Sequence, residues 1–176
     1  MKTKIFFLIA GLAFSMFSCN NDTVESIPNL PDDIDEIIAE IENFVVPLKE
    51  KSPETIVSQF ESMHEAWEET WSRPEIIIYS TARKYAESEE YYSLLAFCKP
   101  YGKAIWPLVM EKLLQNYIFD ACLLEDLTIP EYLFLFDESK RVAMDYNRRP
   151  EIIYSYLLLK KEEDNIREAV DHWKNK

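Results

Sequence analysis

The chain has 176 residues, of which 32 are acidic and 19 are basic, so its formal net charge is −13. Hydrophobic residues make up 48% of it, including four Trp, ten Tyr and ten Phe, which predicts a packed globular fold and excludes an intrinsically disordered chain. The excess of acids argues against nucleic acid as a partner, because binding nucleic acid depends on Lys and Arg side chains that neutralise phosphates.

Residues 1–18 have the three parts of a secretory signal peptide: a basic start, an apolar run from Ile5 to Phe17, and a small residue, Ser18. The run is shorter than the roughly 20 residues of a membrane-spanning helix. The letters MFSC, which end at Cys19, resemble the lipobox of bacterial lipoproteins. The resemblance implies that Cys19 is lipidated and begins the mature chain. The alternative is an ordinary signal peptide that a cysteine happens to follow.

The lipobox resemblance also implies a location. The residue after the cysteine is Asn20, not the Asp that favours retention in the inner membrane of some bacteria, so we expect the outer membrane. Removal of the signal peptide takes two lysines with it, which moves the net charge from −13 to about −15. The polar residues 19–31 are expected to form a flexible tether, and residues 32–176 a single domain.

The first helix is expected from about Asp33 to Lys49, where isoleucines and other apolar residues recur at helical spacing after an acidic start. Pro47 is expected to end or bend it. Further along, Pro-Glu recurs at four places and is typical of a helix start, since Pro suits the first helical position and Glu suits the helix dipole. These starts come in two pairs, which predicts stacked helical hairpins, although chance recurrence is the alternative; they lie at Pro53, Pro74, Pro130 and Pro150.

The central region predicts two more helices around a turn. Ser88 is expected to cap the first of them, and the letters KPYGK, with Gly102, to turn the chain into the second. The spacing of apolar residues with Gly and Pro at the turn, together with FESMHEAW, makes the region from Phe60 to Thr128 resemble a HEAT-like helical module of uncharacterised bacterial proteins. The resemblance implies an all-α, HEAT-like stack of antiparallel helical hairpins, with about seven or eight helices in the whole chain.

His64 raises the question of a metal site. Glu61-x-x-His64 has the spacing that di-iron helical bundles use, and Glu68 lies one turn further on. Such a bundle needs a second Glu-x-x-His, which the chain lacks; the other histidine is His172. Glu61, His64 and Glu68 are therefore minor candidates for metal ligands. We favour a structural role, in which His64 flanks the core face of a helix and hydrogen-bonds to its acidic neighbours.

Other catalytic patterns are missing from the sequence. Gly11 and Gly102 are the only glycines, so the chain has neither a Gly-rich phosphate loop nor a dinucleotide fingerprint, and no G-x-S-x-G elbow occurs. Cys98 and Cys122 lie in apolar runs, which favours two buried thiols over a disulfide or a reactive thiolate. We predict no catalytic residues, no cofactor and no enzymatic activity.

Aromatic residues are the remaining indication of function. Tyr and Trp can anchor protein partners or stack on sugars, and several are concentrated in the central region. We predict a non-enzymatic, lipid-anchored protein of the cell envelope that binds an envelope protein partner. The alternatives are a glycan-binding lipoprotein and a helical metal-dependent enzyme centred on Glu61, His64 and Glu68. The candidate binding patch, whose members could also simply pack between helices, consists of Tyr91, Tyr92, Tyr101 and Trp106.

Overall fold

A computed structural model describes residues 30–31, 33–77, 81–116, 119–129, 131–146 and 149–173. The predicted signal peptide and the predicted lipidation site at Cys19 lie outside these residues, as does the tether up to residue 29. Leu30, from the end of the predicted tether, is partly buried and packs against the hydrophobic core.

The described residues are helical, with no β-strand among them, so the predicted all-α fold is confirmed. Seven of the helices have at least nine residues, in agreement with the predicted seven or eight. In chain order the elements are α1 (Ile34–Lys51), α2 (Glu54–Thr70), α3 (Pro74–Ile77), α4 (Ala82–Tyr85), α5 (Glu89–Cys98), the 3-10 helix η1 (Lys99–Ile105), α6 (Trp106–Asn116), α7 (Asp120–Thr128), α8 (Leu133–Tyr146) and α9 (Pro150–Trp173).

Helix α1 begins as predicted and ends later than predicted. The Asp33 side chain caps it by accepting a hydrogen bond from the backbone N–H of Asp35 at 2.9 Å. Pro47 does not end the helix, which continues to Lys51. The buried face of α1 runs from Ile37 to Leu48, past the exposed Pro47, so packing of this face holds the helix together where proline removes one backbone hydrogen bond.

The Pro-Glu starts are confirmed at three places. Pro53 is the N-cap residue of α2, while Pro74 and Pro150 are the first residues of α3 and α9; Pro130 lies outside the described residues. Helix α3, however, has only four residues and none of them is buried. The first pair of starts therefore does not produce a hairpin of two long helices.

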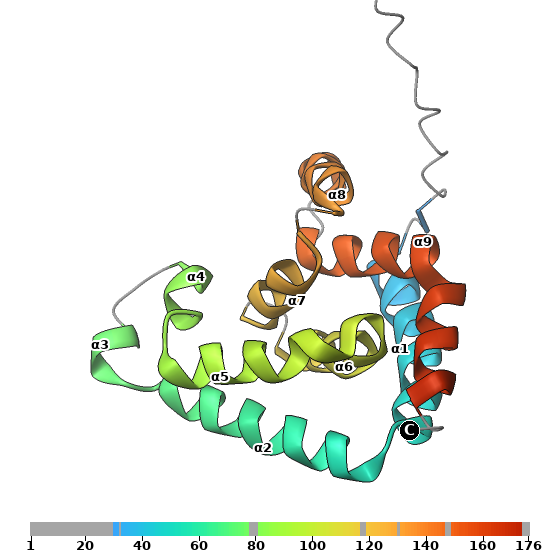
Figure 1. Cartoon of the computed structure of the whole chain (residues 1–176). Coiled ribbons are helices and arrows are strands. Elements are labelled where there is room, and N and C mark those ends of the chain that lie inside the picture. Colours follow the sequence, from blue (N-terminus) through green and yellow to red (C-terminus); the bar gives the residue numbers. More distant parts are fainter. Residues whose placement is uncertain are drawn as a thin grey trace, which may run out of the picture.

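The long helices stack in neighbouring pairs (Figure 1): α2 lies along α5, α1 packs against α6 and α9, and α8 packs on α9. In α9 eight consecutive residues, from Ile152 to Leu159, are buried, because neighbouring elements cover this half of the helix on every side. The turn between α5 and α6 passes through η1, where Gly102 has a φ of 55°, a backbone conformation that favours glycine. Within the described part of the chain, no helix combines the length and apolarity that a membrane span requires.

Candidate functional site

His64 lies on the core side of α2 and is fully buried. Its Nε2 atom is 2.6 Å from Oδ1 of Asp120, the first residue of α7, which is also fully buried. Glu68, one turn along α2, is partly exposed, and its Oε2 atom lies 3.7 Å from Nδ1 of His64. The main partner of His64 is therefore a carboxylate from another helix, and not an acidic neighbour on its own helix as the sequence suggested.

The three minor metal candidates do not form a metal site among the described residues. Glu61 forms ion pairs with Lys49 at 2.9 Å and with Lys112 at 2.6 Å, and Lys49 also binds Glu111. Burial raises the pKa of Glu61, but the hydrogen bonds from the two lysines outweigh that effect and hold this pKa below its ordinary value. A carboxylate that two ammonium groups hold is poorly placed to bind a cation. Among the described residues, no group of three or more His, Cys, Asp or Glu side chains could hold a metal ion.

Aromatic rings surround the His64–Asp120 pair. The ring centroids of Phe60, Trp67 and Trp71 lie 5.9, 5.6 and 6.2 Å from that of His64. Burial raises the pKa of Asp120, and the hydrogen bond from His64 opposes this rise. Since neither side chain of the pair is exposed to solvent, a substrate cannot reach it. The pair joins α2 to α7 inside the core.

The predicted four-residue aromatic patch does not form, because two of its members are buried. Tyr91 is fully buried, and its hydroxyl donates to Oδ2 of Asp126 at 2.6 Å. Trp106 is also buried and packs edge-on against Tyr132, with ring centroids 5.7 Å apart. Both residues lie on the inner faces of their helices, which a local aromatic count cannot reveal. Tyr92 alone of the four is well exposed.

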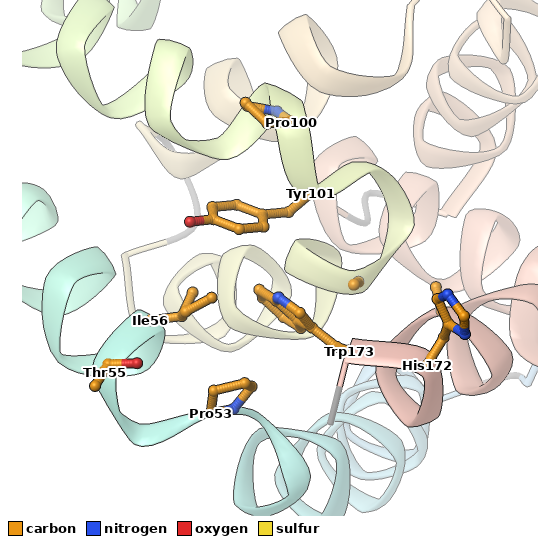
Figure 2. Close-up of a pocket in the computed structure, with 9 residues that line it drawn as sticks. Pro53, Thr55, Ile56, Pro100, Tyr101, His172 and Trp173 are labelled. Carbon is orange, nitrogen blue, oxygen red and sulfur yellow. The ribbon is translucent and has the colours of Figure 1, made fainter. Parts of the chain in front are cut away.

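The fourth member, Tyr101, lines a pocket of about 550 Å³ where the start of α2, the 3-10 helix η1 and the end of α9 meet. Figure 2 shows Tyr101, Trp173 and Ile56 around this space, with His172 at one side. Each of the three elements contributes three residues: Pro53, Thr55 and Ile56 from the start of α2; Pro100, Tyr101 and Ala104 from η1; and Ala169, His172 and Trp173 from α9.

Local structure explains the walls of this pocket. Pro100 and the positive φ of Gly102 shape η1 into a tight turn between α5 and α6, and this turn carries Tyr101. The ring of Tyr101 lies 5.0 Å from that of Trp173 at an interplanar angle of 43°. The largely buried Trp173 thus forms one wall, while the side chains of Thr55 and His172 are exposed.

The pocket differs in charge from two other concavities on the described surface. One is lined by Glu75, Glu87, Glu89 and Glu90 with two basic residues. The other, along the outer side of α2, is lined by three glutamates with Lys112. As far as the structure describes the chain, the pocket at Tyr101 has no carboxylate, Lys or Arg in its lining, although the chain carries 32 acids. It is a largely apolar site of the size that small ligands or inserted side chains occupy.

The two cysteines of the folded region are free and buried, which confirms the prediction of two buried thiols. Burial raises the pKa of Cys98 to about 12 and is the main cause that raises the pKa of Cys122 to about 11. A thiol with such a pKa is protonated at neutral pH and is a poor nucleophile.

Sequence reasoning missed two parts of these sites. Asp120 follows a short apolar run, and no local pattern pairs it with a histidine 56 residues earlier. Trp173 and Pro53 form the pocket with Tyr101, but they lie far apart in the chain. The only available signal was the concentration of tyrosines near the turn, which pointed to Tyr101.

Comparison of this chain with protein-family models, curated proteins and solved structures finds no match. The resemblance of the region from Phe60 to Thr128 to a HEAT-like module stays a prediction from the sequence.

Proposed function

We propose that this protein is a lipid-anchored, non-enzymatic binding module of the bacterial cell envelope, and that it contacts a protein partner through the pocket between α2, η1 and α9. The observation that supports the proposal is the pocket itself: an apolar, partly aromatic space of about 550 Å³ at the surface. Protein partners commonly insert one or a few large side chains into pockets of this kind, and such anchors supply much of the binding energy. Lipidation of Cys19 would hold the pocket at the outer membrane.

The buried polar groups support binding over catalysis. The one His–Asp pair that the described residues form is closed off from solvent, and the two cysteine thiols are buried with raised pKa values. A catalytic acid, base or nucleophile must reach the substrate within hydrogen-bonding distance. The proposed module therefore uses its accessible pocket, and its buried polar groups stabilise the fold.

The test is purification of the full-length protein from its bacterium in mild detergent, with mass spectrometry of the eluate. Thr55→Trp places a large ring at the pocket, and Ser62→Trp, two turns along the exposed side of α2, is the matched control. We expect a stoichiometric partner to remain with the wild type and Ser62→Trp and to be lost from Thr55→Trp. A partner that Thr55→Trp retains would place the contact elsewhere. A protein that is alone in all three eluates would refute partner binding.

The membrane anchor is tested separately. We expect Cys19→Ala to move the protein from the detergent-soluble membrane fraction to the soluble fraction, or to leave an unprocessed precursor. Membrane fractionation with an immunoblot measures this. Normal processing with an unchanged membrane fraction would refute lipidation at Cys19.

A further inference from the structure

We propose that the pocket receives an uncharged aromatic side chain of the protein partner, an inference that rests on the partner-binding function proposed above. Three properties of the lining lead to this chemistry: its lack of charge, the position of its polar groups and the arrangement of its rings. The start of α2 adds a reason to expect a polypeptide.

The lack of charge excludes a charged group as the inserted part. Among the described residues, the lining has no carboxylate, Lys or Arg that could pair with an ion, and His172 is its one side chain that can carry a positive charge. Glutamates and at least one basic residue line each of the two other concavities. Moving an ionised group from water into an apolar pocket without a counter-charge is strongly unfavourable. The inserted group is therefore uncharged.

The position of the polar groups argues against a sugar. Thr55 and His172 are exposed, whereas Ile56, Ala104 and Ala169 present only carbon. A sugar carries hydroxyls around its whole ring, and those facing the apolar wall would lose their hydrogen bonds to water without replacement. An apolar ring with at most one polar edge avoids this loss.

The rings of the wall favour an aromatic over an aliphatic group. The lining residues Tyr101 and Trp173 form a continuous series with Phe97, which is not part of the lining, with centroid separations of 5.1 Å (Phe97–Tyr101) and 5.0 Å (Tyr101–Trp173) and interplanar angles of 65° and 43°. Tilted and edge-on geometries are the ones that aromatic rings prefer, and each such pair is stabilised beyond the area it buries. A ring inserted beside Trp173 would extend the series.

The start of α2 favours a polypeptide as the source of the ring. Pro53, the N-cap residue, has no side-chain oxygen and makes no capping hydrogen bond, so no side chain of the N-cap residue accepts from the first N–H groups of α2. The N–H of Ile56 donates to the carbonyl of Pro53 at 2.9 Å, while Pro53 and Thr55, at this end of α2, belong to the pocket lining. Backbone carbonyls that flank an inserted side chain are suitable acceptors, and a free aromatic molecule lacks them.

A random peptide display library, selected on the full-length protein in mild detergent, tests the inference. We expect the selected peptides to share one aromatic residue. Binding of a selected peptide, measured by fluorescence anisotropy, should weaken at least about tenfold in Thr55→Trp and in Tyr101→Ala. It should be unchanged in Ser62→Trp, and circular dichroism should show equal helix content in all variants. A peptide in which alanine replaces the aromatic residue should bind at least about tenfold more weakly. A peptide in which cyclohexylalanine replaces it should bind a few-fold more weakly.

Several outcomes would overturn the inference. Selected peptides without a shared aromatic residue would refute the inference that the pocket binds an aromatic side chain. Equal binding of the cyclohexylalanine peptide would show that the pocket selects apolar groups in general and not aromatic rings. Binding unchanged in Thr55→Trp would place the site elsewhere. Methyl glycosides and p-cresol are tested as small ligands by the quenching of tryptophan fluorescence. If one of them binds more tightly than any peptide, and the quenching is lost in Thr55→Trp, the ligand is a sugar or a free aromatic molecule, respectively. If a purified partner depends on Thr55 while the peptides carry no aromatic residue, this inference fails and the proposed function stands.

Discussion

Helix α2 borders two sites that each contain a histidine and a tryptophan but differ in the exposure of the histidine and in the charge around it. On its core side, His64 and Trp67 are fully buried, and His64 contacts a buried carboxylate of α7. At its start, α2 faces His172 and Trp173 of α9, where the histidine is exposed and no carboxylate of a described residue lines the pocket. Both tryptophans are thus largely buried, whereas the histidine is sealed in the core in one region and exposed at the surface in the other.

The comparison shows that the surroundings of each histidine decide whether it stabilises the fold or lies at an accessible site. His64 is surrounded by three aromatic rings and has a charged partner, so solvent is excluded and the pair holds two helices together. Within the described part of the chain, His172 has neither three such rings nor a charged partner, and it lines the pocket. We therefore expect substitutions in the His64 cluster to change stability, and substitutions in the pocket to change binding. Two predictions test this separation and a third tests the ion pairs of Glu61 on α2; they run from the largest expected effect to the smallest.

Asp120→Ala should have the largest effect. It leaves His64 buried without its partner, and removal of one member of a buried pair costs about 3–5 kcal/mol in the free energy of unfolding. Urea unfolding followed by circular dichroism measures this. Asp120→Asn is the matched control, since its amide oxygen can still contact His64, and it should cost about 1 kcal/mol. A loss below about 1 kcal/mol in Asp120→Ala would mean that the pair does not stabilise the fold.

The same Trp→Phe substitution can be compared in the two regions. The Trp67 indole donates a hydrogen bond to the backbone carbonyl of Tyr85 at 2.6 Å, so Trp67→Phe should cost about 2–3 kcal/mol by leaving that buried carbonyl unpaired and a small cavity. The Trp173 indole has no hydrogen bond within the described residues, and Trp173→Phe should cost about 1 kcal/mol or less. Urea unfolding of both variants gives the difference. Equal losses would contradict the separation between core and pocket.

Glu61→Gln should have the smallest effect, and one that depends on pH. The pKa of Glu61 is lower in the folded state, so its ion pairs stabilise the fold above the unfolded-state pKa of about 4.3, and this stability is lost as the pH falls through the folded-state value. We expect a loss of about 1 kcal/mol or less at pH 7, because Glu61 is one-third exposed and partly screened.

The measurement for Glu61 is the difference in unfolding free energy between wild type and variant from pH 7 to pH 3. This difference should shrink as the pH falls below about 4.3. Glu65→Gln, on the exposed side of the same helix, is the control and should change stability by less than about 0.5 kcal/mol. A difference that grows as the pH falls would contradict the role of the ion pairs.

Much of the fold was predictable from local sequence. Helical spacing of apolar residues indicates α1, α2, α5 and α6, and the cap expected at Ser88 is formed. Such features depend on contacts within a few residues, which the periodicity of a helix encodes directly. The burial of Cys98 and Cys122 follows in the same way from the apolar runs that contain them. The sequence also singled out Tyr101, one of the nine residues that line the pocket.

The tertiary structure alone decided which faces meet. Periodicity places His64 on the inner side of its helix, but its partner Asp120 lies 56 residues away on another helix. The pocket likewise depends on the meeting of α2, η1 and α9, whose lining residues span more than a hundred positions in the chain, from Pro53 to Trp173. The sequence by itself determined that the chain is helical and which side of each helix is apolar, because those properties arise from near neighbours. It could not determine the buried His64–Asp120 pair or the pocket at Tyr101, because both arise from contacts between helices that are far apart in the sequence.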